Sequence, residues 1–256
     1  MSSKPTTTLF LAWHPPQVSH VQTQPVTIGR LDYDGTNYTF QYTAGIEETN
    51  APFAGVVEFP NRSTTYSSKS LFPLFANRLM SPSRKDFPES LEKLGLPKGA
   101  TPMTILGRSA GRKATDRFRV FPYPERTSEG FRAQFFLENS KSNAEMAVVP
   151  DKHAMLIHSN DFGLSMTGSQ SDMTVQSSNG ISMGQIPGYY AREFRSLLKS
   201  QHRLDFEILQ VNAPSNRWAP NVVLVEVTGQ WPEEWTPFES GEYEPLAAKV
   251  SPVAQR

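Results

Sequence analysis

The sequence predicts a β-rich protein of the α+β class. Its 256 residues include 21 prolines and 16 glycines, which divide the chain into pieces too short for long helices. Several pieces, residues 26–43 above all, alternate apolar and polar side chains as strands do. Residues 187–198 instead repeat their apolar side chains with the spacing of an amphipathic helix. We therefore expect a majority of strands with a few helices packed against them.

The first half is expected to form a hairpin, two short helices and further strands. Asp34-Gly35 predicts a two-residue turn that joins a strand at 28–33 to a strand at 38–42. One helix is expected at 71–80, where Pro73 suits the first turn, and another at 88–94, before Gly95. Further strands are expected at 53–59, 103–106, 118–121 and 131–137.

A domain boundary is expected near residue 126, in a segment that is rich in proline and polar residues. Beyond it the chain predicts a second β-rich unit that contains the amphipathic helix 187–198. The stripe of this helix consists of Tyr190, Ala191, Phe194, Leu197 and Leu198. The strands of this unit are expected at 155–158, 173–177, 181–186, 206–211 and 222–227, with a turn at 178–180.

Composition excludes several functional classes. The chain contains no cysteine, which excludes disulfides, thiolate metal sites and a cysteine nucleophile. Its five histidines show no metal-ligand spacing, so neither a metal nor another cofactor is expected. No apolar run approaches the length of a membrane-spanning helix or an ordinary signal peptide. The expected location is the cytoplasm.

The net charge of zero hides an uneven distribution. Residues 78–119 hold ten basic and four acidic side chains. Near the C-terminus, five glutamates follow one another with no basic residue between them, interleaved with aromatic residues. A basic middle and an acidic end can bind a polyanion, or bind each other.

One motif has the form of a catalytic site. Gly107-Arg108-Ser109-Ala110-Gly111 matches the G-x-S-x-G pattern of serine hydrolases, with the predicted strand 103–106 before it. Asp161 or Asp172, followed by His202, could complete a triad. However, a β-like segment follows Gly111 where a hydrolase has a helix, and no alternation of strands and helices surrounds it. The sequence therefore favours a glycine turn. The neighbouring cations Arg108, Arg112 and Lys113 could either contact a phosphate backbone or form a solvated basic loop.

Residues 9–122 resemble the small N-terminal subdomain of HipA-type kinase toxins. The resemblance is carried by five blocks in the same order and spacing: 26–31, 38–42, 71–80, 94–96 and 105–111. In that family the subdomain is a small α/β cap without catalytic groups, and it also occurs as a separate protein that restrains a separate kinase. The kinase motifs themselves are absent from this chain.

Residues 131–230 resemble a HIRAN domain. The resemblance is carried by residues 179–194, which include a glycine-rich strand, Ile186-Pro187 and the Tyr190-Ala191-Arg192 helix. It implies a small β-barrel, related to OB-folds, with one or two helices; some members grip the 3′ end of single-stranded DNA. In the binding loop, Ser169 and Gln170 stand where the family has a Tyr–Asp pair, and Asp172 keeps a polar type.

Together these features predict three parts: a HipA-N-terminal-like module at 9–122, a HIRAN-like domain at 131–230, and an acidic aromatic tail at 231–256. The expected function is that of a non-catalytic adaptor that binds single-stranded DNA or DNA ends, in bacterial defence, repair or a toxin–antitoxin system. The expected binding residues are Arg84, Lys85, Arg108, Arg112, Lys113, Arg117, Phe135, Tyr189, Tyr190 and Arg192.

Two alternatives remain open at this point. The protein could regulate a separate HipA-like kinase, or a nuclease or helicase complex, through protein contacts made by its acidic tail. A serine hydrolase that uses Ser109 is the third hypothesis.

Overall fold

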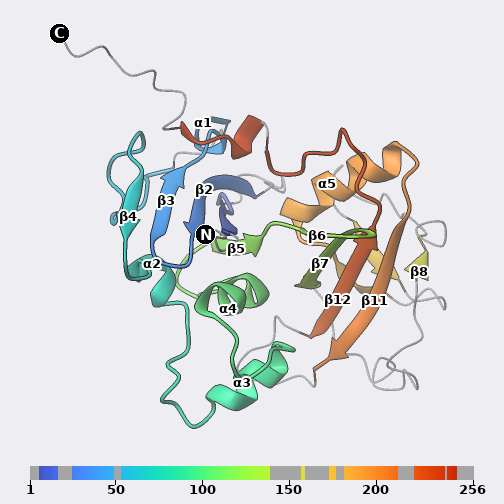
Figure 1. The fold of residues 1–256 in the computed structure, drawn as a ribbon, viewed down its shortest axis with the longest axis horizontal. Coiled ribbons are helices and arrows are strands. Elements are labelled where there is room, and N and C mark those ends of the chain that lie inside the picture. Colours follow the sequence, from blue (N-terminus) through green and yellow to red (C-terminus); the bar gives the residue numbers. More distant parts are fainter. Residues whose placement is uncertain are drawn as a thin grey trace. The chain divides into compact units, whose positions relative to one another are not determined.

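The computed structural model describes residues 6–16, 25–48, 53–138, 157–158, 173–176, 182–212, 222–239 and 241–246. The chain divides into two compact units. Unit 1 consists of Met1–Pro82, Thr101–Tyr123 and Thr236–Arg256, and unit 2 of Ser83–Ala100 and Pro124–Trp235. Both are built on antiparallel sheets with short helices, so the β-rich α+β class is confirmed (Figure 1).

Unit 1 contains a five-stranded antiparallel sheet. Its strands lie in the order β4 (Tyr66–Ser68), β3 (Tyr38–Tyr42), β2 (Val26–Tyr33), β1 (Thr7–Trp13) and β5 (Phe118–Pro122).

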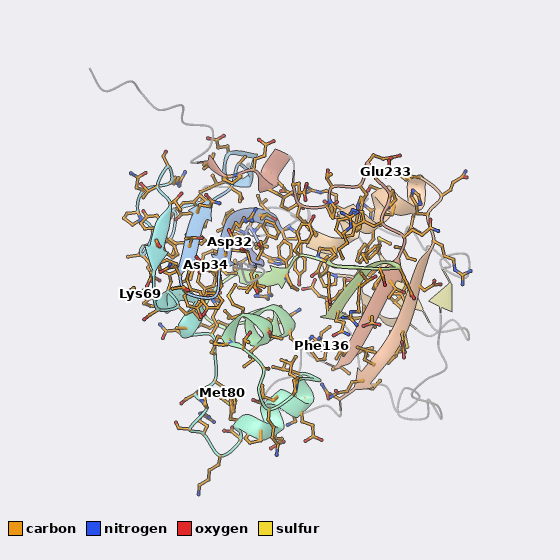
Figure 2. The ribbon with its side chains drawn as sticks, viewed as in Figure 1. Asp32, Asp34, Lys69, Met80, Phe136 and Glu233 are labelled. Carbon is orange, nitrogen blue, oxygen red and sulfur yellow. The ribbon has the colours of Figure 1, made fainter. Side chains whose placement is uncertain are left out.

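The predicted hairpin is β2–β3, but its loop has four residues rather than two, because Tyr33 pairs directly with Tyr38. The Asp34 carboxylate accepts hydrogen bonds from the backbone N–H groups of Thr36 and Asn37, at 2.8 and 2.7 Å. Gly35 takes a φ of 95°, which favours glycine. Asp34 is labelled at this loop in Figure 2.

Among its described residues, unit 1 has the α-helices α1 (Gly45–Glu48), α2 (Pro73–Ala76) and α4 (Pro102–Ser109). The prediction of a strand at 103–106 was wrong, because those residues form α4. The Thr101 side chain caps this helix by accepting from the Thr104 N–H at 3.2 Å, and Pro102 starts it. The strand expected at 53–59 was also wrong. Val56–Phe59 is an isolated bridge closed by a tight turn.

The core of unit 1 lies on one face of the sheet. Alternate residues of β1 point to it, together with Ile28 and Leu31 of β2, and α2, α4 and the 53–59 loop cover it. Its fully buried side chains include Leu9, Leu11, Ile28, Leu31, Phe40, Phe59, Phe75 and Leu106.

The C-terminal segment, residues 236–246, packs within unit 1. The Phe238 ring lies 5.6 Å from the ring of Phe10 and 5.4 Å from that of Phe121. The Ala44 N–H donates to the Glu244 carbonyl oxygen at 2.8 Å, and a short 3₁₀ helix spans Gly241–Tyr243. Because Phe10 alternates with the core residues of β1, Phe238 and Tyr243 cover the other face of the sheet, whereas Leu246 belongs to the core. The aromatic side chains of this segment are therefore part of the fold.

Unit 2 contains a second five-stranded antiparallel sheet, with strands in the order β6 (Glu125–Thr127), β7 (Gly130–Phe136), β12 (Val223–Gly229), β11 (Leu204–Val211) and β8 (Ile157–His158). A separate pair is formed by β9 (Thr174–Gln176) and β10 (Ser182–Gln185). Within the described residues the expected barrel is absent: β6 and β8 are the two edges of an open sheet. The turn expected at 178–180 lies outside the described residues.

The predicted amphipathic helix is α5 (Gly188–Lys199), and it supplies the core of unit 2. The Tyr190 ring stacks on Phe135 at 4.8 Å and on Phe194 at 5.6 Å. The helix predicted at 88–94 is α3 (Phe87–Lys93), which also belongs to unit 2. The side chains of Gln210 and Asn212 donate to carbonyl oxygens in its last turn, at 3.0 and 2.7 Å.

Candidate functional site

The glycine-rich motif ends helix α4 and starts the connection to β5. Ala110 and Gly111 both take left-handed conformations, with φ values of 55° and 51°. A Cβ atom on Gly111 would lie 2.9 Å from the Val120 side chain, so this position has little room for a side chain. The two residues reverse the chain at the end of the helix, as the glycine-turn reading of the motif predicts.

Ser109 lies in the last turn of α4 and has local partners. Its hydroxyl donates to the Leu106 carbonyl oxygen at 3.4 Å and accepts from the Gly111 N–H at 3.2 Å. A nucleophile elbow places its serine between a strand and a following helix, whereas here a helix precedes the serine and a strand follows. Of the other triad candidates, His202 belongs to unit 2, and Asp161 and Asp172 lie outside the described residues.

Residues 108–119, which we call the basic segment, carry five basic side chains and one acidic side chain. The acidic one, Asp116, forms an ion pair with Arg78 at 2.6 Å. The Arg78 side chain is 1% exposed and also donates to the Gly111 carbonyl oxygen at 2.8 Å. This buried pair anchors the segment to the body of unit 1. Asp116 is therefore already engaged by a cation from outside the segment.

Three arginines of the basic segment gather around His14, which follows β1. The backbone N–H of His14 donates to the Arg117 carbonyl oxygen at 2.9 Å. The Arg117 guanidinium donates to the Pro15 carbonyl oxygen at 3.2 Å. Arg119 lies on β5 opposite Ala12, two residues before His14. Burial, followed by the charges of Arg119, Arg112 and Arg117, lowers the pKa of His14 from 6.5 to about 4. The positive charges of these three arginines thus act on the region around His14.

Four of the predicted binding residues lie in the basic segment of unit 1, and the others belong to unit 2. Arg108, Arg112, Lys113 and Arg117 all lie on the basic segment, the first two half-buried and the last two exposed. The cations predicted elsewhere are Arg84, Lys85 and Arg192, which are exposed residues of unit 2. Arg84 forms an ion pair with Asp86 at 2.8 Å.

The three aromatic rings predicted to stack on bases are buried in the core of unit 2. Phe135 is 4% exposed, Tyr189 6% and Tyr190 0%. A base must reach the face of a ring to stack on it, and these faces are occupied by other protein side chains. We therefore leave these rings out of the candidate interface. The loop with Ser169 and Gln170 lies outside the described residues.

Reasoning from the sequence missed two residues of this site, Arg119 and His14. Arg119 belongs to the basic stretch 78–119 and to the predicted strand 118–121, but it was not among the predicted binding residues. His14 has no sequence neighbour of the same chemistry. Only the pairing of β1 with β5 brings it to the basic segment.

Unit 2 contains a pocket of about 720 Å³ where β7 and β11 begin and β12 ends. Ion pairs already involve its cations: Arg132 with Glu125 at 2.7 Å, and Arg203 with Asp205 at 2.8 Å. Its remaining lining is mixed, with amides, hydroxyls, His202 and further carboxylates. This mixture does not select a ligand class, so the basic segment is the candidate site.

No family model, curated protein or solved structure matches this chain. In the described ranges, no three or more histidine, aspartate and glutamate side chains are grouped so as to hold a metal ion. None of the helices that the structure describes combines the length and apolar character needed to cross a membrane.

Proposed function

We propose that the protein is a non-catalytic nucleic-acid-binding adaptor and that the basic segment contacts the phosphate backbone. The observation that carries the proposal is a segment with five basic side chains, three of which lower the pKa of His14, and a single carboxylate that is paired with Arg78. Arginine suits phosphate because its planar group offers several N–H donors and keeps its charge. Exposed Lys113 extends the same surface.

The proposal gives sequence-independent binding. Contacts to phosphates provide affinity and orientation but read no bases. With the rings of Phe135, Tyr189 and Tyr190 in the core, unit 2 offers no stacking surface from these residues. We therefore expect single strands of different sequence to bind with similar affinity, with no requirement for a free 3′ end.

The assignment of the two modules belongs to this proposal. Residues 9–122 keep the order of elements that suggested a HipA-N-terminal-like cap, apart from the helix at 102–109. The HIRAN-like assignment is supported by the predicted α5 directly after β10. A role in bacterial defence, repair or a toxin–antitoxin system is part of the same proposal, and rests on these resemblances alone.

The tail does not favour the regulator hypothesis. Trp235, Phe238 and Tyr243 are at most 7% exposed, so their rings are not available to a kinase or a larger complex. A chain shortened to Gly229 would lose core residues of both units, and partner loss on such truncation would not identify a binding tail. We therefore develop only the nucleic-acid proposal.

Fluorescence anisotropy with a labelled oligothymidylate tests the proposal. The double variant Lys113→Gln/Arg117→Gln removes two exposed cations of the basic segment. The matched control, Lys69→Gln/Lys98→Gln, removes two exposed cations outside it. Lys69 lies directly after β4, at the edge of unit 1 (Figure 2). Weaker binding by the first variant alone supports the proposal. Equal binding by both variants, or no binding by the native protein, contradicts it.

A further inference from the structure

His14 lies next to the basic segment with one imidazole nitrogen buried and without a hydrogen-bond partner. This nitrogen is the Nε2 atom. The residue follows the end of β1, and its backbone is tied to Arg117 by the hydrogen bond between the His14 N–H and the Arg117 carbonyl oxygen. Arg119, opposite Ala12, and Arg112, in the turn after α4, bring two further cations to it.

The cations that act on the His14 imidazole do not titrate. Arg112, Arg117 and Arg119 stay protonated throughout the ordinary pH range. The carboxylate in the same segment, Asp116, is engaged by Arg78 and by the Phe118 N–H. The free protein thus holds His14 neutral at neutral pH, because burial and three cations oppose a fourth positive charge.

We propose that Arg112, Arg117 and Arg119 bind a phosphate group, and that His14 takes up a proton when they do. This inference rests on the proposed function, since it names the chemistry of the same site. An anion on the three guanidinium groups cancels part of their positive charge and so reduces the repulsion that opposes a proton on the imidazole. Protonated His14 then adds one more charge that favours the anion, so binding and protonation strengthen each other.

The direction and size of the pH dependence of anion affinity follow from the coupling between anion binding and protonation of His14. Above pH 7, His14 is neutral with or without the anion, so it contributes nothing to the pH dependence. Below that, the bound state takes up a proton before the free state does, so affinity rises as pH falls. A full return of the pKa of His14 from about 4 to its ordinary 6.5 would make affinity at about pH 5 roughly 30-fold higher than at about pH 8. Because burial, the largest cause of the lowered pKa, remains when the anion binds, we expect a rise smaller than this limit.

Two measurements on the full chain test this inference. The first is oligothymidylate binding between about pH 8 and about pH 5, because neither thymine nor a phosphodiester titrates in that range. The native protein is compared with His14→Gln and with His202→Gln, which removes a histidine from unit 2. The second is an NMR titration of the imidazole signals of the native protein, alone and with saturating oligothymidylate or sulfate. The signal absent from the His14→Gln spectrum identifies His14.

The inference expects a rise in affinity on acidification that His202→Gln keeps and His14→Gln loses, together with an upward shift of the His14 titration midpoint in the presence of either anion. It is overturned if all three proteins share one pH dependence, or if the midpoint does not move at saturation. Should the oligonucleotide not bind at any pH, the proposed function fails. The sulfate titration then decides the inference alone: a raised midpoint supports the anion site, and an unmoved midpoint overturns it.

Discussion

Phe238 offers a sharp test of the finding that the C-terminal segment is part of unit 1. Its ring is 2% exposed and contacts four others, those of Phe10, Phe121, Tyr123 and Tyr243. Phe238→Ala removes this buried ring and leaves a cavity among the remaining four. Such truncations cost about 3–5 kcal/mol in well-packed cores. Because each aromatic contact adds about 0.5–1.5 kcal/mol, we expect the upper half of that range.

Urea unfolding followed by intrinsic fluorescence measures the effect, with Val57→Ala as the matched control. Val57 is also apolar but is 99% exposed, so its truncation should leave the unfolding midpoint unchanged. A Phe238→Ala protein that unfolds at the same urea concentration as the native protein would refute the reasoning. Residues 236–246 would then contribute little to the stability of unit 1.

Two further predictions concern the basic segment. Asp116→Asn removes the ion-pair partner of the buried Arg78 side chain. We expect the free energy of unfolding, measured in urea, to fall by about 2–3 kcal/mol. A change below about 0.5 kcal/mol would contradict the anchoring role of the pair. We expect a smaller loss than for a fully buried pair, because the Asp116 side chain is 24% exposed. Ser109→Ala should leave oligonucleotide affinity unchanged, and a fluorophosphonate probe should not label Ser109 in the native protein; labelling at that residue would restore the hydrolase hypothesis.

The alternation of residues was a good guide to strands, and turn residues a good guide to where elements end. Val26–Tyr33 and Tyr38–Tyr42 are strands because one face of each supplies the core while the other carries polar groups. Gly95, the residue that predicted the end of a helix, follows α3 with a φ of 63°, the left-handed conformation that glycine readily adopts. These signals depend only on neighbouring residues, so they can be read from the sequence without knowledge of the rest of the fold.

Residues 103–106 show where local signals conflict. Four apolar or small residues in a row fit a strand or a buried helix equally well. The decisive features stand just before them: the Thr101 cap and Pro102 at the first helical position. The strand prediction gave no weight to this helix-start signal, so it assigned the wrong element.

The candidate site was also predictable from the sequence only in part. The charge of residues 108–119 was readable from the sequence, whereas the approach of His14 depends on the pairing of β1 with β5 across about a hundred residues of chain. The stacking role given to Tyr190 conflicted with its place in the predicted apolar stripe of α5. The structure puts that residue in the core, as the stripe required.

The salt dependence of oligothymidylate binding tests the central claim most directly. If the basic segment makes about four phosphate contacts, affinity should fall roughly 150-fold between about 50 and about 300 mM salt. For Lys113→Gln/Arg117→Gln, which loses two of these contacts, the fall over the same range should be only about 12-fold. The Lys69→Gln/Lys98→Gln control should keep the native slope. Equal slopes for all three proteins, or affinity that does not depend on salt, would contradict the assignment of the basic segment as the nucleic-acid interface.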